Sequence, residues 1–229
     1  MKKVAILAGM MVMILGFSMQ AHSSLSVVGQ GTSADGTYSL IYDTDLNVTW
    51  YDFTRNANSW QSQMNWADAL TVTFGNSNFD NWRLPTIIDN GAPGTAYDGS
   101  RPKGYNVTNS DMGHLFYEEL GNTGRYDTNA VVEPFYGLSN KGPFGSLLTK
   151  PYWTNTLLAA NTSNAWNFTF STGEQSYAGK SGSRHAIALH EGNIASAITV
   201  VPEPISSTLF IVSGAIMGLR QFRKKTKNY

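Results

Sequence analysis

Two apolar segments, one near each end of the 229-residue chain, limit the part of the sequence that can fold as a globular domain. The first covers residues 4–19, follows Lys2 and Lys3, and leads into small and polar residues. This order is typical of a secretory signal peptide cleaved after Ala21 or Ser23, and an uncleaved N-terminal anchor is the alternative. The sequence thus predicts three parts: a signal peptide over 1–23, one domain over 24–199 and a C-terminal membrane segment over 200–229.

The C-terminal segment combines three features. The triplet Pro202, Glu203 and Pro204 comes first, and its prolines keep the chain extended and delay helix formation. The uncharged stretch 205–219 follows, and as a helix it would rise about 22 Å, less than the roughly 30 Å hydrocarbon core of a bilayer. Five basic residues come after Leu219 and favour the cytoplasmic side of a membrane. The segment is therefore short for a permanent anchor, although an ordinary tail anchor is the alternative.

Charge is distributed unevenly along the chain. The whole sequence has 16 Lys+Arg and 16 Asp+Glu, but seven of the basic residues and one of the acidic residues lie in the two end segments. The domain between them carries nine basic and 15 acidic side chains, a net charge of −6. Nucleic acids and anionic lipid surfaces bind to positive charge, so we expect neither as a partner of the domain.

The domain has to fold by packing alone. It contains all six tryptophans of the chain and no cysteine, so disulfides cannot hold it. The missing thiols also exclude cysteine nucleophiles, cysteine-ligated zinc and iron–sulfur clusters. About 180 residues suffice for a single hydrophobic core, and we expect most of the tryptophans to lie in it.

Side-chain periodicity predicts two helices and six short strands. Apolar residues recur every three or four positions over 60–70 and again over 111–120, where Ser110 can cap the helix and Gly121 can end it. Alternating patterns predict strands over 37–42, 48–53, 152–156, 165–170, 175–178 and 185–190. The segments 74–82 and 87–109 are expected to be loops. Two helices among antiparallel strands indicate the α+β class.

The C-terminal segment resembles a known sorting signal. Its triplet Pro202-Glu203-Pro204, apolar stretch and basic cluster follow one another as in the PEP-CTERM signal of Gram-negative bacteria that export surface polysaccharide. In that family a membrane enzyme, exosortase, recognises and processes the signal. The resemblance implies an exported protein that is held in the inner membrane before processing and then reaches the cell surface or the extracellular matrix.

The domain resembles a second family. Over roughly residues 35–198 it is similar to the C-terminal domain of the Lcl collagen-like adhesin. This implies a single C-type-lectin-like α+β domain, with two helices on small antiparallel sheets and long loops, flanked by a signal helix and a C-terminal hydrophobic helix. The resemblance depends on the order of DTDLNVTW (43–50), MNWADAL (64–70), WRLPT (82–86), MGHLFYEELGN (112–122), YWTNT (152–156) and AWNFTFSTGEQSYAGKSGSRHAIALHEGNI (165–194).

Two motifs have a structural interpretation beside a functional one. Asp43-x-Asp45-x-Asn47 begins like a calcium loop, but the next residue is valine where that loop requires glycine, and its final glutamate is also missing. A turn is therefore favoured. Arg83 could bind a ligand, but its five donors favour a role in tying loops together, with the neighbouring Trp82 and Leu84 in the core.

His114 and Glu118, four residues apart on the second predicted helix, could share a metal. The pair supplies only two ligands, however, so a contact that stabilises the helix is favoured. No serine lies in a nucleophile elbow, no glycine-rich phosphate loop is present, and the adjacent Glu118 and Glu119 diverge too much for a glycosidase pair. The sequence therefore predicts no catalytic residue, no metal ligand and no cofactor.

The remaining candidate is a surface of amides and aromatic rings that suits a neutral or cationic saccharide. Sugar rings stack on Trp or Tyr, and planar polar side chains bind their hydroxyl groups. The sequence predicts a non-catalytic surface or matrix module that binds exopolysaccharide or mediates adhesion. A hydrolase or modifying enzyme on a formylglycine-generating-enzyme-like scaffold and a purely structural matrix protein are the alternatives. The expected ligand contacts are Asn78, Asp80, Asn81, Tyr97, Tyr105, Tyr152 and Asn155.

Overall fold

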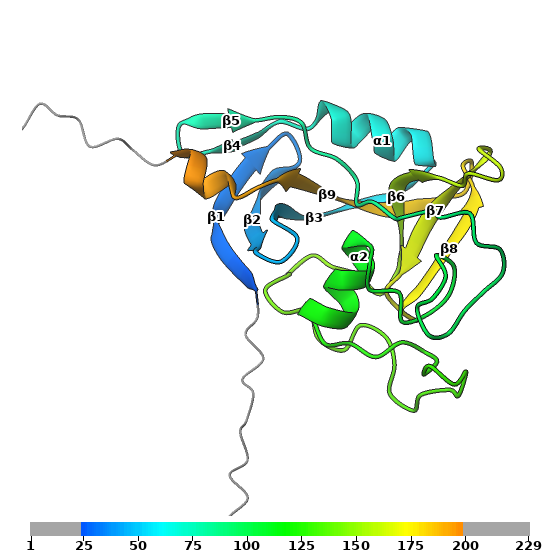
Figure 1. Ribbon diagram of the computed structural model, residues 1–229. Helices are drawn as coiled ribbons and strands as arrows, with labels where there is room; N and C mark the ends of the chain where they lie inside the picture. Colours follow the sequence, from blue (N-terminus) through cyan, green and yellow to red (C-terminus); the bar gives the residue numbers. More distant parts are fainter. Residues whose placement is uncertain (1–23, 199–229) are drawn as a thin grey trace, which may run out of the picture.

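The computed structural model describes residues 24–198, and a mixed nine-stranded sheet dominates it (Figure 1). The strand order across the sheet is β5-β4-β1-β2-β3-β9-β6-β7-β8. β9 and β6 pair in parallel through Tyr152 and His185, and the other strand pairs are antiparallel. The strands are β1 (Leu25–Ser33), β2 (Gly36–Asp43), β3 (Val48–Asn58), β4 (Val72–Phe74), β5 (Ser77–Phe79), β6 (Pro151–Leu157), β7 (Asn164–Thr169), β8 (Glu174–Gly179) and β9 (Arg184–Glu191).

Two short helices lie on opposite faces of this sheet (Figure 1). Each begins after a serine, Ser59 or Ser110, whose side chain accepts a hydrogen bond from the backbone N–H three residues later. Such caps satisfy donors that the first helical turn leaves free. The helical segments are α1 (Trp60–Ala69), α2 (Asp111–His114), the π-helical turn η1 (Leu115–Glu119) that continues α2, and the 3₁₀ turn η2 (Ile194–Ile198) after β9.

Alternate residues of the central strands point to opposite faces of the sheet, and a core forms on each face. Ile41 of β2 and Trp50 of β3 belong to the cluster that packs against α2 and η1. Their neighbours Leu40 and Tyr51 pack on the other face, together with Trp82. The central strands are therefore covered on both sides.

Most of the predicted elements are confirmed. The six predicted strands correspond to β2, β3, β6, β7, β8 and β9, and the first predicted helix corresponds to α1. The predicted turn over 43–47 is present, with Asn47 at a φ of 53°. Five of the six tryptophans are at most 8 % exposed, and only Trp66 is half-buried, so the expected tryptophan core is confirmed.

The predicted fold class is wrong. The chain over 24–198 forms mainly one large mixed sheet with two short helices, rather than a lectin-like α+β domain with two helices on small sheets. The sequence pattern misses β1 because Gly29 and Gly31 interrupt its alternation. The predicted loop over 74–82 contains part of the hairpin β4–β5, which turns at Gly75 with a φ of 59°. The second predicted helix has a single α-helical stretch of four residues before the π-helical turn.

The predicted signal peptide and C-terminal membrane segment lie outside the residues that the structure describes. Within residues 24–198, no helix has the length and apolar character needed to cross a bilayer. Both end segments, and the helices expected in them, therefore stay predictions.

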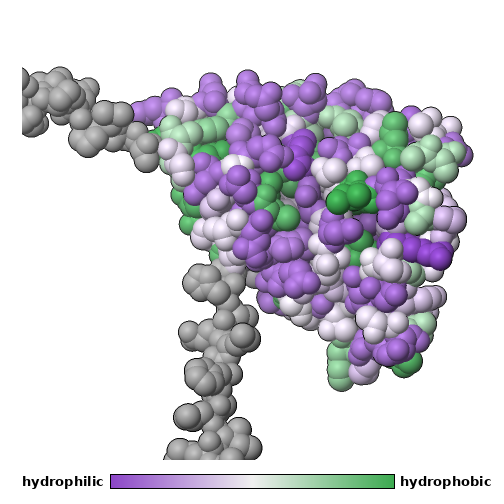
Figure 2. All heavy atoms as spheres, in the orientation of Figure 1, coloured by the Kyte–Doolittle hydropathy of each residue, from purple (hydrophilic) through white to green (hydrophobic). Residues whose placement is uncertain are grey.

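Exposed apolar side chains gather on the loop over 125–137. Val131, Val132 and Phe135 are 61 %, 53 % and 89 % exposed. The loop projects from the lower side of the molecule in Figure 1, where Figure 2 shows hydrophobic spheres at the end of a mainly hydrophilic surface. Phe135 is therefore an aromatic side chain outside the core, and a useful reference for the buried ones.

The long irregular loop before α2 is held against the sheet at two points. Gly104 pairs with Gln175 of β8 through backbone hydrogen bonds of 2.8 and 2.9 Å. The hydroxyl of Tyr117 accepts a hydrogen bond from the N–H of Asn106 at 2.9 Å and donates one to the carbonyl of Gly173 at 2.7 Å. Burial raises the pKa of Tyr117 to about 12. This hydroxyl therefore links the helix, the loop and the β7–β8 turn.

We expect Tyr117→Phe to lower the free energy of unfolding at pH 7 by about 1–3 kcal/mol, because the N–H of Asn106 loses its partly buried acceptor. The variant should also change the alkaline behaviour. The folded protein holds the phenol proton more tightly than the unfolded chain, whose tyrosine pKa is about 10. The contribution of Tyr117 should therefore be fully present below pH 10, and its loss should remove up to about 3 kcal/mol of the parent's stability as the pH rises to about 12.

Urea unfolding between pH 7 and pH 12 measures both effects of Tyr117→Phe. The variant should lose less stability than the parent over the alkaline window. Tyr136→Phe is the control, because it also removes a tyrosine hydroxyl, but from a residue that is 42 % exposed. An alkaline decline of Tyr117→Phe as steep as that of the parent would contradict the assignment.

Candidate functional site

The side chains predicted to form a saccharide surface lie towards opposite edges of the sheet. Asn78, Asp80 and Asn81 are exposed on and just after β5, the strand at one edge. Tyr97 and Tyr105 belong to the loop that pairs with β8, the strand at the other edge. Because the width of the sheet separates them, the structure does not bring these two groups together at one site.

The other two predicted contacts lie in or beside the core. Tyr152 of β6 is fully buried, and its hydroxyl bonds with Thr54 and with the N–H of Leu148, each at 2.9 Å. Asn155 is half-buried, and its backbone N–H donates to the carbonyl of Pro85 at 2.9 Å. Tyr152 therefore has a structural role, and its ring offers no face to a ligand.

Three loop tyrosines pack on one another. The rings of Tyr97 and Tyr105 are stacked, 5.8 Å apart and 2° from parallel, and Tyr126 meets both of them at an angle. Tyr105 is 7 % exposed, and burial together with the charge of Glu174 raises its pKa. Replacing Tyr105 would therefore disturb the packing of the loop, which makes it a poor probe of ligand binding.

A groove beside α1 brings an aromatic ring together with several polar side chains. Its volume is about 760 Å³, and it lies between α1, the β1–β2 turn and β3. Trp66 lines the groove, its indole N–H donates to Asp35 at 2.9 Å, and the guanidinium of Arg55 lies 5.5 Å from the ring centroid. The other polar residues of the lining are Ser59, Gln61, Ser62, Asn65 and Thr71.

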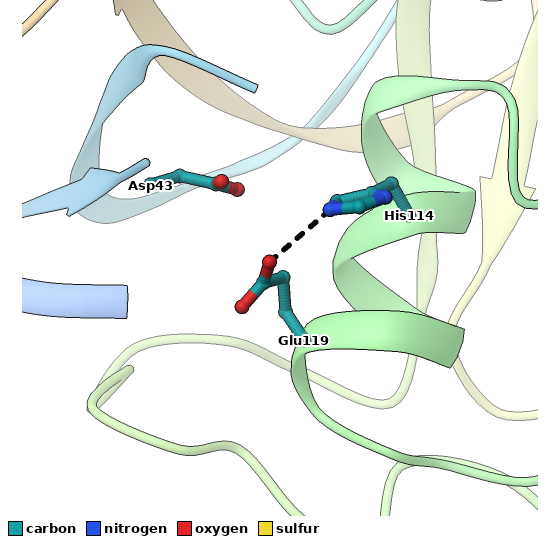
Figure 3. A group of neighbouring side chains, drawn as sticks. All are labelled: Asp43, His114 and Glu119. Carbon is teal, nitrogen blue, oxygen red and sulfur yellow. Dashed lines mark hydrogen bonds and ion pairs between the residues drawn. The ribbon is translucent and has the colours of Figure 1, made fainter. Parts of the chain in front are cut away.

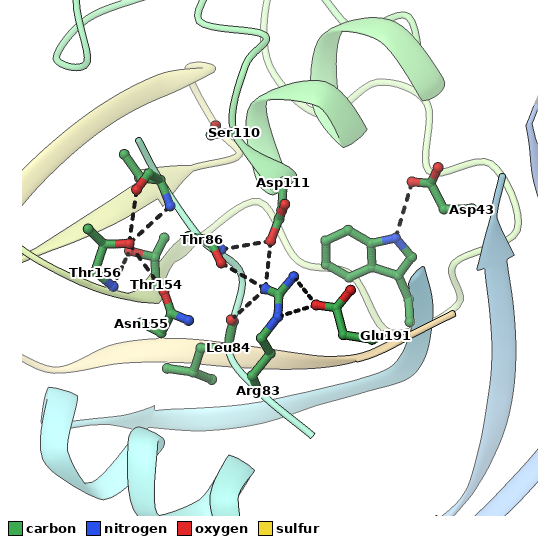
Figure 4. Close-up of polar contacts among 12 residues, drawn as sticks. Asp43, Arg83, Leu84, Thr86, Ser110, Asp111, Thr154, Asn155, Thr156 and Glu191 are labelled. Atoms are coloured by element: carbon green, nitrogen blue, oxygen red, sulfur yellow. Dashed lines mark hydrogen bonds and ion pairs between the residues drawn. The ribbon is translucent and has the colours of Figure 1, made fainter. Parts of the chain in front are cut away.

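Arg83 is the centre of a polar network that joins three segments (Figure 4). Its guanidinium forms ion pairs with Asp111 at 2.8 Å and with Glu191 at 2.7 Å. It also donates to the hydroxyl of Thr86 at 2.8 Å and to the carbonyl of Leu84 at 3.2 Å. Burial alone would lower the pKa of Arg83, but the two carboxylates outweigh it and raise that pKa. The predicted role of Arg83 in tying loops together is confirmed.

Three ionisable side chains meet between the sheet and α2, although they lie far apart in the sequence (Figure 3). Asp43 ends β2, His114 ends α2 and Glu119 ends η1. One potential ligand atom of each lies within 4.8 Å of the other two, and Nε2 of His114 is 3.1 Å from Oε1 of Glu119. Asp43 is fully buried, and the side chains of His114 and Glu119 are 19 % and 4 % exposed. The three residues could hold a metal ion.

Neighbouring groups orient the carboxylate of Asp43. Its Oδ1 accepts from the backbone N–H groups of Asp45 and Leu46 at 3.2 and 3.0 Å. Its Oδ2 has a longer contact, 3.4 Å, with the indole N–H of Trp50 (Figure 4). Burial raises the pKa of Asp43, and the nearby charge of Glu119 raises it further. Burial therefore outweighs the hydrogen bonds that favour the ionised form of Asp43.

The four-residue spacing predicts that His114 contacts Glu118, and this prediction is wrong. His114 pairs with Glu119 instead. Glu118 is exposed. The helix changes to π geometry after His114, so that the N–H of Leu120 bonds to the carbonyl of Leu115, five residues back. Residues five apart lie about 140° apart around an α-helix but are closer on the wider π-helical turn. Only the unusual turn creates this pair, and no sequence signal marks it.

Comparisons of the chain with protein-family models, with curated proteins and with solved structures found no match. The family relationships expected from the sequence therefore stay predictions. The functional argument depends on the side chains themselves.

Proposed function

We propose that this protein is exported and that its domain is a non-catalytic module that binds saccharide at the cell surface or in the extracellular matrix. Support for export comes from the sequence, through the signal peptide pattern over 1–23 and the sorting signal pattern that begins at Pro202. The groove beside Trp66 is the observation that supports binding. We propose this groove as the ligand site instead of the seven ligand contacts predicted from the sequence, which do not form one site.

The groove has the chemistry that a saccharide needs. Trp66 is the one tryptophan of the six that is not buried, and its ring supplies the aromatic surface of the groove. Gln61 and Asn65 lie exposed on α1 and add planar donors and acceptors for hydroxyl groups. Asp35 and Arg55 carry opposite charges, which favours a neutral ligand. An open groove of this kind would bind each sugar unit weakly and gain strength from repeated units.

The test of this proposal removes the two amides from the groove. Gln61→Ala with Asn65→Ala should weaken binding about ten-fold, because two hydrogen bonds of about 0.5–1.5 kcal/mol each are lost. The free energy of unfolding should change by less than about 0.5 kcal/mol, since both sites are exposed and alanine favours helix. A glycan array identifies the ligand, and retention in gels containing the host polysaccharide measures the affinity.

Asp68→Ala is the matched control, because Asp68 is exposed on the same helix but does not line the groove. It should bind like the parent. Equal retention of the double variant and the parent would show that the groove is the wrong site. If the parent protein binds no glycan on the array and none from its host, the binding-module proposal itself is wrong.

A further inference from the structure

Asp43 and Glu119 place two carboxyl groups close together below the surface, since Asp43 is fully buried and the side chain of Glu119 is 4 % exposed. The described chain contains three ion pairs; two belong to Arg83, and the third joins Glu119 to His114. No lysine or arginine within residues 24–198 therefore pairs with either carboxylate. Burying a carboxylate is costly unless a positive charge accompanies it. A cation held between the two carboxylates and the imidazole of His114 would supply such a charge, and the three side chains lie close enough together to hold one.

The donor set indicates which cation fits. One imidazole nitrogen and two carboxylate oxygens suit Zn²⁺, which binds such donors at roughly 2.0–2.2 Å. Ligand atoms around a tetrahedral zinc ion then lie about 3.4 Å apart, and Nε2 of His114 is already 3.1 Å from Oε1 of Glu119. Ca²⁺ and Mg²⁺ prefer oxygen donors alone and more of them.

The surroundings already orient these donors. The π-helical turn places His114 and Glu119 side by side, and such turns are frequent at functional sites. The hydroxyl of Ser24 donates to Oε1 of Glu119, and the indole N–H of Trp50 contacts Asp43 at 3.4 Å. Hydrogen bonds of this kind fix the orientation of metal-binding side chains. Asp43 is fully buried and lies close to the other two side chains (Figure 3).

We propose that Asp43, His114 and Glu119 form a zinc-binding site that fastens the end of β2 to the α2–η1 helix. Three protein donors leave a fourth position of a tetrahedral zinc ion for water. The site belongs to the α2 side of the sheet, whereas the proposed saccharide groove is lined by α1. Zinc binding and saccharide binding can therefore be tested independently, and the failure of one proposal leaves the other unchanged.

The experiment is a zinc titration of the purified protein after dialysis against a chelator. One equivalent of Zn²⁺ should bind per chain, as measured by calorimetry and by metal analysis. A hundred-fold excess over Kd should raise the Tm by about 5–10 °C, because zinc binds the folded state and joins separate elements. Ca²⁺ at the same concentration should produce no comparable shift.

Two variants locate the site. Asp43→Asn retains an oxygen for the N–H groups of Asp45 and Leu46 but removes the charge, and His114→Gln retains a donor for Glu119 but removes the imidazole. Each should weaken zinc binding at least ten-fold and abolish the Tm shift. Glu118→Gln is the matched control, because Glu118 is exposed beside the site and should leave both unchanged.

Several results would overturn the zinc site. The proposal is wrong if the parent binds less than one equivalent of Zn²⁺ or shows no rise in Tm. It is also wrong if zinc binding persists in Asp43→Asn. If His114→Gln fails to fold, Asp43→Asn alone tests the site. A larger shift with Ca²⁺ than with Zn²⁺ would reject zinc as the ion.

Discussion

Replacing Trp82 with alanine should lower the free energy of unfolding by about 3–5 kcal/mol, the usual cost of removing a large aromatic ring from a core. Trp82 is 3 % exposed. Its ring lies 5.8 Å from that of Tyr51 and 5.4 Å from that of His190, and its indole N–H donates to the carbonyl of Phe79 at 3.0 Å. The substitution would therefore leave a cavity between β3, β5 and β9 and remove the hydrogen bond from the indole to the carbonyl of Phe79.

Urea unfolding of the purified protein measures the effect of Trp82→Ala. Phe135→Ala is the reference, since Phe135 is 89 % exposed and its removal should change stability by less than about 0.5 kcal/mol. A loss below about 1 kcal/mol for Trp82→Ala would mean that the ring is not part of the core. In that case the segment around β5 would again be a candidate ligand surface.

Local patterns predict local structure in this chain, but not how the parts assemble. The alternation of 37–42 and the helical spacing of 60–70 identify β2 and α1, because each element buries one side against a neighbour. The position of β9 between β3 and β6 has no local signal, since strand pairing is decided by residues far apart in the sequence. That one strand joins the small sheets expected from the sequence into a single large sheet.

The candidate sites show the same limit. The sequence identifies His114 as a potential ligand, but its partners depend on a π-helical turn and on the approach of Asp43 from β2. It also identifies Arg83 correctly as a link between segments, because the five donors of a guanidinium can bind several partners at once. It misses the groove, since Trp66 looks like the other tryptophans until the fold shows which one stays accessible.

Replacing Pro202, Glu203 and Pro204 with alanine should abolish processing of the C-terminal segment in the native host. The proposed sorting signal is expected to need an extended, accessible segment before the apolar stretch, which is the conformation that prolines favour. Alanine is the strongest helix former, so the change would let the apolar helix begin near residue 200 instead of 205. Its rise would grow from about 22 Å to about 30 Å, which matches the hydrocarbon core of a bilayer.

The triple-alanine variant should therefore accumulate in the membrane fraction at the mass of the unprocessed chain, while the parent is released in a shorter form. Mass spectrometry of the membrane and released fractions distinguishes the two. Ser206→Ala with Ser207→Ala is the matched control, because it alters the apolar stretch beside the triplet without adding helix-forming residues in front of it. The control should be processed normally. Release of the triple-alanine variant at the parent's mass and yield would reject motif-directed sorting, because the triplet would then have no part in recognition.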